Sequence, residues 1–360
     1  MPGSRGDVPV MVGEAGGAAG GPGEASCAGV TYSGGYGDLT RQVRTAGLLR
    51  RHPSAFAAHA VALLLVLVAV VMLMTALRDS WWILVAAPLL AVIATRFSFL
   101  GHDLGHRQIT RSAMGSRVLG LLVGNLLSGL SYDWWVRKHN AHHAHPNDLA
   151  SDPDVRAGAL IWHPSQGAGR RGVGAWWTRH QAALFFPLLS LEAVNLHISS
   201  VRALVVPNLR LRAAEATLLA AHFAGYGVLL ALTMSWPQAI VFLILHKSVQ
   251  GLYLGCSFAP NHKGMPILSD EQAQDPLLRQ VLTSRNVRGG PVTDALLGGL
   301  NYQIEHHLFP SMPRSNLRFA QPLVRAFCVE RDIPYVECSA LGSYRAAITH
   351  MHRVGATVHG

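Results

Sequence analysis

The sequence predicts an all-α membrane protein with four transmembrane helices arranged in two hairpins. Half of the 360 residues are hydrophobic and 14% are charged, whereas a soluble globular domain carries about 25% charged residues. Four stretches are apolar over about 20 residues, the length that a helix needs to cross a hydrocarbon core of about 30 Å. Nearly all basic residues fall on one side of these four stretches.

The first segment, residues 1–36, contains low-complexity runs such as GEAGGAAGGPGEAS that cannot bury a core. It has no positive region followed at once by an apolar run, so we expect a disordered tail rather than a signal peptide. Residues 37–54 form a basic juxtamembrane segment with apolar residues at helical spacing. This pattern fits either a helix lying on the membrane surface or a solvated basic linker.

The predicted spans are residues 56–77, 81–100, 213–233 and 236–255. The second begins with two tryptophans, as expected at a bilayer interface. The linking sequences RDS and MSW are short enough to allow only tight reversals, so consecutive spans pair as hairpins.

Two other apolar stretches are poorer candidates. Residues 117–130 are apolar over about 14 residues, which suits an interfacial or partly buried helix. Residues 183–200 contain Glu192, Asn195 and His197 and would make a poor span.

Charge sets the predicted orientation. With four spans, the turns on one side contain a single basic residue, Arg78. By the positive-inside rule the opposite side is the cytosol, so both termini are expected there. The net charge of +10 suits anionic lipids or an acidic redox partner, and we find no nucleic-acid motif. The four cysteines match no zinc or redox spacing.

Three histidine groups then fall on the same predicted face. These are His102 and His106 in HDLGH, His139, His142 and His143 in HNAHH, and His306 and His307 in QIEHH. Residues three or four apart share one face of a helix, and neutral imidazole binds zinc, copper, iron and nickel. Seven histidines exceed what one ion can use, so the pattern predicts two metal ions.

Other polar residues have ordinary explanations. A single histidine at a helix end is usually a cap or a surface residue, and His145 is expected near the site or at the surface. His59 and His222 lie inside spans, away from the three groups, which argues against a bis-histidine haem bundle. Lys247 is costly inside the fourth span and would either reach the interface or meet an acidic group.

The three histidine groups resemble the histidine boxes of membrane fatty acid desaturases. The resemblance extends to HPNDLASDPDV, FAPNHKGMP and QIEHHLFPSMPR and covers roughly residues 38 to 350. A third box that opens with Gln is similar to front-end acyl desaturases and their bacterial relatives without a fused cytochrome b5. The resemblance implies a desaturase domain over residues 55–350, a tail over 351–360, and a cytosolic helical cap that holds a diiron site.

The resemblance also implies further site residues. His262 matches an additional metal ligand of the family, and Gln303 stands where many relatives have a ninth histidine. An amide is a poor iron ligand, so a water held by Asn261 would complete that shell. Carboxylates that would orient the ligand histidines are Asp103, Asp152, Asp154 and Glu305, with a solvated turn as the alternative for Asp152 and Asp154.

The implied activity is formation of a cis double bond in a fatty acyl chain, carried by acyl-CoA or acyl-lipid, with O2 and two electrons. The electrons would come from a separate ferredoxin-like or cytochrome donor with its reductase, because we find no flavin, haem or iron–sulfur motif. The implied location is a bacterial plasma membrane with the active site in the cytosol. The alternatives are a related diiron hydroxylase or ketolase, and a non-enzymatic metal- or haem-binding multi-span protein.

Overall fold

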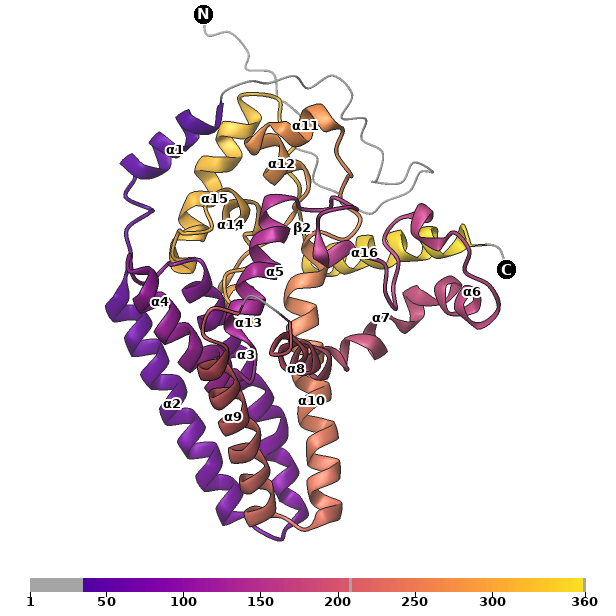
Figure 1. Cartoon of the computed structure of the whole chain (residues 1–360). Helices are drawn as coiled ribbons and strands as arrows, with labels where there is room; N and C mark the ends of the chain where they lie inside the picture. Colours follow the sequence, from indigo (N-terminus) through magenta and orange to yellow (C-terminus); the bar gives the residue numbers. More distant parts are fainter. Residues whose placement is uncertain (1–34, 207–208, 359–360) are drawn as a thin grey trace, which may run out of the picture.

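The computed structural model describes residues 35–206 and 209–358, and these residues are mostly helical. The predicted tail 1–36 therefore lies outside the described residues except for its last two, which begin helix α1 (Gly35–Thr45). In Figure 1 a bundle of long helices stands below a cap of shorter ones.

In the part of the chain that the structure describes, four helices are long and apolar enough to cross a membrane, which confirms the predicted spans. They are α2 (Pro53–Ala76), α3 (Ala86–Gly105, preceded by the 3-10 turn Trp81–Val85), α9 (Arg212–Thr233) and α10 (Trp236–Phe258). The turns between α2 and α3 and between α9 and α10 lie at the lower end of Figure 1. They touch there, because the N–H of Asp79 lies 3.4 Å from the carbonyl oxygen of Thr233.

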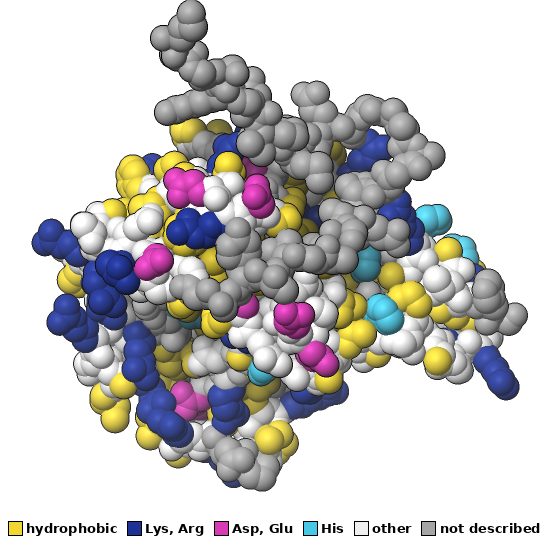
Figure 2. Space-filling model, turned by 90° about the horizontal axis from the view of Figure 1, so that it is seen from above, with side chains coloured by type: hydrophobic (Ala, Val, Ile, Leu, Met, Phe, Trp, Pro, Cys, Tyr) yellow, Lys and Arg dark blue, Asp and Glu magenta, His cyan; other side chains and the backbone are white. Residues whose placement is uncertain are grey.

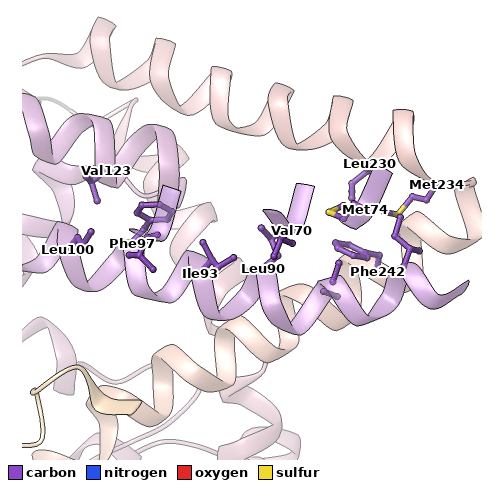
Figure 3. Packing of buried hydrophobic residues seen from close by; sticks show 14 of the residues in the cluster. Val70, Met74, Leu90, Ile93, Phe97, Leu100, Val123, Leu230, Met234 and Phe242 are labelled. Atoms are coloured by element: carbon purple, nitrogen blue, oxygen red, sulfur yellow. The ribbon is translucent and has the colours of Figure 1, made fainter. Parts of the chain in front are cut away.

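Helix α3 is the centre of the bundle and is the most buried of the four spans. Its Leu90, Ile93 and Phe97 pack with Met74 of α2 and Phe242 of α10 (Figure 3). The large apolar side chains on the outside of α2 stay exposed. Such a surface would be a liability in water but is what lipid requires.

The stretch predicted as an interfacial helix has a more complex structure. It comprises α4 (Ala113–Gly120) and a π-helix, Leu121–Ser128, which packs on α3 and α9. The chain then turns by 105° into α5 (Tyr132–Ala144). A second bent pair, α7 (Gln181–Leu189) and α8 (Glu192–Ala203), turns by 70°. Each bent pair is apolar enough for a broken span, so residues 35–206 and 209–358 contain four to six candidate spans.

The first bend is held by buried polar contacts. Glu215 of α9 accepts hydrogen bonds from the side chains of Asn125 and Ser131 and from the N–H of Asp133. A buried carboxylate is tolerated when donors satisfy its oxygens. Glu215 thereby fixes the start of α5, the helix that carries the second histidine group.

Lys247 belongs to a neighbouring polar cluster. Its Nζ lies 3.1 Å from Nε2 of His197 and 3.0 Å from Oε1 of Gln250. His197 in turn contacts the carbonyl of Gly129, and His222 contacts that of Leu126. The partners of Lys247 are thus an imidazole and an amide rather than the acidic group that was one of the two expectations.

The cap is built from short helices and one pair of strands. They are α6 (Gly172–Arg179), α11 (Asp270–Gln274), α12 (Pro276–Leu282), β1 (Asn286–Val287), α13 (Pro291–Leu297), α14 (Gln303–Leu308), α15 (Arg314–Val329), β2 (Glu337–Cys338) and α16 (Ala340–Ala356). Strands β1 and β2 pair in parallel, with Asn286 opposite Glu337. Apolar residues of α12, α14 and α15 form the core of the cap.

Two predicted segments differ from the structure. Leu39 and Val43 of α1 are fully buried in the cap core, so the 37–54 segment starts as a cap helix rather than a membrane-surface helix or a solvated linker. The expected tail 351–360 is also wrong in part, since α16 continues to Ala356 and buries Met351 and Val354. In both segments, apolar residues at helical spacing pack against other parts of the protein.

Candidate metal centre

Eight histidines converge where the bundle meets the cap. They are His102 and His106 at the end of α3, His139, His142 and His143 on α5, His262 after the short turn Ala259–Asn261, and His306 and His307 on α14. Seven are buried and His139 is half-buried. His145, two residues beyond the second group, is exposed.

One group consists of His102, His106, His139 and His306, which each offer a nitrogen within 4.8 Å of the other three. The Nε2 atoms of His102 and His306 lie 3.2 Å apart. Trp135 stacks on the ring of His139 with centroids 4.5 Å apart, so it packs over this group.

The second group consists of His142, His262 and His307, again with nitrogens within 4.8 Å of one another. The Nε2 atoms of His142 and His262 lie 3.4 Å apart. His143 lies between the two groups. Its Nε2 is 3.1 Å from that of His139, and its ring stacks on His307 with centroids 4.2 Å apart.

The tautomers of the second group follow from its hydrogen bonds. Nδ1 of His142 faces a carboxylate oxygen of Asp152 at 2.9 Å, and Nδ1 of His262 faces the carbonyl of Thr283 at 3.0 Å. Both partners only accept, so each Nδ1 carries the proton and each Nε2 is unprotonated, with a lone pair.

His307 has the same tautomer. Its Nδ1 lies 2.9 Å from Oε1 of Gln280, whose Nε2 donates to the carbonyl of His143. That second bond fixes which end of the Gln280 amide is the acceptor. Three lone pairs therefore point into one small space, an arrangement that a cation between them would stabilise.

Burial keeps these rings neutral. It lowers the pKa of His106, His262, His306 and His307 well below the usual value for histidine, and the neighbouring histidines lower each pKa further. A neutral ring has the free lone pair that a metal ion needs.

The residues fit a metal site by two further tests. Buried nitrogens of His106, His143, His306 and His307 have no hydrogen-bond partner among the described residues. Two imidazole nitrogens bound at about 2.1 Å to one ion, at angles near 90 to 110°, lie about 3.0 to 3.4 Å apart. The Nε2 pairs in both groups match this spacing. The histidine clusters are thus compatible with a metal site.

The predicted carboxylates have unequal roles. Asp152 is fully buried on His142, whereas Asp154 is partly exposed, bonds to Lys138, and is 3.7 Å from His142. Asp103 lies 3.5 Å from Nδ1 of His102 and 2.6 Å from Arg314 of α15. Asp152 is therefore not a solvated turn residue.

Glu305 does not orient a histidine, contrary to the prediction. One of its oxygens accepts from Asn286 at 2.7 Å and the other from Tyr335 at 2.8 Å. Burial raises the pKa of Glu305 to about 7, although these two hydrogen bonds oppose the rise. Glu305 instead ties α14 to β1 and to the segment before β2, because its side chain points away from the histidines.

Asn261 contacts Gln303 directly, and a water held by Asn261 stays a prediction. Its Nδ2 donates to the carbonyl of Leu300 at 3.1 Å and to Oε1 of Gln303 at 3.2 Å. Nε2 of Gln303 then faces Nε2 of His262 at 2.9 Å. Gln303 thus borders the second group and presents its amide nitrogen to it.

Several residues at the site were not predicted. Gln280 links His307 to His143, and Asn147 lies 3.3 Å from the carbonyls of His262 and Thr283. Asn147 lies within the motif HPNDLASDPDV, whereas Gln280 belongs to no motif and is 27 positions from its partner His307. A signal for Gln280 was its polarity among the apolar residues of α12.

Comparison with known proteins decides the family. The model of the family described as "Fatty acid desaturase" matches residues 79–339. The chain belongs to the fatty acid desaturase family. The matched residues include three of the four candidate membrane spans and all eight histidines of the site.

Relatives of this desaturase-family chain carry consistent names. It is 31% identical over 272 residues to "Delta(6)-fatty-acid desaturase fat-3" of Caenorhabditis elegans, covering 71% of this chain and 61% of that protein. It is 26% identical over 288 residues to "Delta(8)-fatty-acid desaturase" of Helianthus annuus, covering 75% of this chain and 61% of that protein. It is 29% identical over 251 residues to "Acyl-lipid (9-3)-desaturase" of Borago officinalis, covering 66% of this chain and 56% of that protein. The chain thus spans about 60% of the length of these relatives.

Proposed function

We propose that this chain is an acyl-chain desaturase that introduces a cis double bond into a fatty acyl chain of an acyl-CoA or acyl-lipid. It would use O2 and two electrons from a separate ferredoxin-like or cytochrome donor with its reductase. The observation that carries the proposal is the pair of buried histidine groups, in a family whose matched relatives are named as desaturases.

Two iron ions would occupy the two groups, one held by His102, His106, His139 and His306 and the other by His142, His262 and His307. When bound, the ions supply the redox chemistry with O2 that no amino-acid side chain offers. His143 lies between the groups and can complete either ligand set. Iron suits these positions because imidazole is a good ligand for it.

The chain's own residues prepare the ligands. Asp152, Gln280 and the carbonyl of Thr283 hold protons on Nδ1, which leaves Nε2 unprotonated on all three rings of the second group. The salt bridge between Asp103 and Arg314 connects the end of α3 to α15. Burial excludes water from both groups, which protects reactive states from side reactions.

We also propose that the histidine end of the bundle faces the cytosol. Basic residues gather at the cap end, and Arg78 alone lies in the opposite turns. The exposed Trp81, Trp82 and Trp236 would mark the other interface. A bacterial plasma membrane is the setting suggested by the resemblance.

The test is fatty acid profiling with double-bond localisation after expression beside a donor system. We expect a new unsaturated product and about two irons per purified chain, without haem absorbance. The variants His306→Ala and His307→Ala should lose product and iron, whereas His145→Ala, at an exposed histidine, should keep both. A hydroxylated product without a new double bond would overturn desaturation, and full iron in His306→Ala would overturn the site.

A further inference from the structure

A groove rich in arginine lies at the junction of cap and bundle. It has a volume of about 900 Å³. It is lined by the end of α1 and the segment after it, the start of α2, the loop after α3, and Ser311. The polar lining residues are Arg44, Arg50, Arg51, Thr110, Arg111 and Ser311.

The groove borders the end of the first candidate span. Pro53, which begins the first span, forms part of its wall. Leu49 and Ile109 also line it, and they pack against the cap core and the bundle core respectively. The groove is therefore basic where it meets water and apolar where it meets the spans, as the boundary of a phospholipid is.

Its arginines have no acidic partners. Among the residues that the structure describes, no carboxylate forms a salt bridge with Arg44, Arg50, Arg51 or Arg111. Arg117 and Arg314, in contrast, pair with Asp133 and Asp103. Four uncompensated guanidinium groups around one groove create a positive potential that attracts an anion.

Membrane topology alone explains arginines at this end of the spans but not their convergence. The four arginines come from two stretches that are far apart in the chain, residues 44–51 and Arg111, and the hydroxyl-bearing Thr110 and Ser311 line the same groove. Arg51 is held in place, since its Nε donates to the carbonyl of Arg107 at 2.9 Å. In Figure 2 dark-blue side chains gather at the left, the side on which α1, α2 and α4 lie in Figure 1.

We propose that this groove binds the phosphate of an anionic phospholipid headgroup. A guanidinium group can donate two parallel hydrogen bonds to phosphate oxygens, and clustered basic residues next to a span recognise anionic lipid. A soluble acidic protein would need a broad exposed surface of about 800 Å², whereas this groove is at membrane level. The proposal holds whether or not the chain is a desaturase.

A bound headgroup would lie close to the histidine groups. Arg107 directly follows His106, and Gln108 bonds to the carbonyl of Pro310 at 2.9 Å and to the N–H of Arg314 at 3.1 Å. The loop that lines the groove thus connects the first histidine pair to the chain after the third. Lipid bound here would stabilise that connection.

The test is native mass spectrometry of the full chain in detergent, titrated with phosphatidylglycerol or phosphatidylcholine. The wild type should prefer phosphatidylglycerol. The triple variant Arg44→Gln, Arg50→Gln and Arg111→Gln should bind phosphatidylglycerol about tenfold more weakly. Arg51 is left intact because it supports the backbone. Replacing the same three arginines by lysine keeps the positive charge but removes the paired guanidinium donors. This variant should bind phosphatidylglycerol with intermediate affinity.

The matched control replaces the exposed Arg171, Arg202 and Arg210 by Gln and removes equal charge elsewhere. It should keep wild-type affinity for phosphatidylglycerol. Equal lipid binding by the groove variant and wild type would overturn the proposal. Inorganic phosphate or coenzyme A that binds the groove as tightly as the lipid would overturn the assignment to a headgroup. The assignment to a headgroup would also be overturned if the groove variant lost affinity for an acidic ferredoxin but kept wild-type affinity for phosphatidylglycerol.

Discussion

The tautomer of each histidine in the second group depends on one acceptor at Nδ1. Asp152 supplies it for His142, Gln280 for His307 and a backbone carbonyl for His262. A substitution of the acceptor should lower the metal content without removing any ligand. Substituting a hydrogen-bond partner of a metal ligand typically lowers metal affinity by roughly 10- to 100-fold.

Asp152→Asn should therefore lower iron content and activity by about tenfold or more. The amide can turn its NH2 toward Nδ1 and favour the wrong tautomer, and it loses the negative charge beside His142. Iron per chain and product formation measure the effect. Asp154→Asn is the control, since Asp154 lies farther from His142 and is partly exposed, and its loss should be smaller. Equal effects of both substitutions would contradict the tautomer argument.

Gln280→Leu should release both His307 and the carbonyl of His143, to which Gln280 is bonded. We expect reduced iron occupancy and a changed optical or Mössbauer signal of the remaining iron. Gln280→Glu keeps an acceptor for Nδ1 and should recover part of the iron. The argument fails if Leu and Glu behave alike.

Glu305 gives a pH dependence with a defined sign. Its folded pKa of about 7 lies above the usual value for Glu, so the folded state binds the proton more tightly than the unfolded state. Its contribution to the free energy of unfolding is therefore highest at acid pH and falls as the pH rises from about 4.5 to about 7. The unfolding temperature of Glu305→Gln relative to wild type should rise over this window, and a constant difference from pH 5 to 8 would contradict the prediction.

At the scale of elements, the bend between the π-helix and α5 decides where the second histidine group lies. Gly129 is in the left-handed region at φ +70, and a Cβ there would lie 2.6 Å from His222 and 2.9 Å from His197. Lys247 supports the same bend through His197. The sequence indicated an amphiphilic helix here but not its sharp turn.

Gly129→Ala should destabilise the protein by about 1–3 kcal/mol, because the added Cβ meets two histidines and the backbone conformation disfavours it. The lower unfolding temperature should come with lower iron, since α5 would shift. Gly225→Ala in α9 is the matched control: a Cβ there meets nothing within 4 Å, and alanine favours a helix. A similar loss in both variants would sink the argument.

At the scale of the whole molecule, we predict that the turns between the spans and the cap lie on opposite sides of the membrane. Cysteines introduced at Asp79 and Ser235 should react with a membrane-impermeant reagent from one side, and cysteines at Asp332 and Ser315 from the other. The native cysteines are first replaced by Ser. In inverted vesicles the cap positions should become accessible if the cap faces the cytosol. Labelling of all four positions from one side would exclude a bundle of four spans.

Sequence alone determined the four spans, the three histidine groups and their common end of the bundle. Apolar length, periodicity and charge bias are local properties that a bilayer constrains strongly. It also placed Asp152 beside the site, through the resemblance. The family match to residues 79–339 agrees with these predictions.

Only the tertiary structure decided how the histidines divide into groups of four and three, with His143 between them. It also assigned Glu305 to the cap, paired Asn261 with Gln303, and brought Gln280 to His307. It buried α1 in the cap and collected four arginines into one groove. The physical reason is that these contacts join segments far apart in the chain, and their choice depends on packing and hydrogen-bond partners that no local pattern encodes.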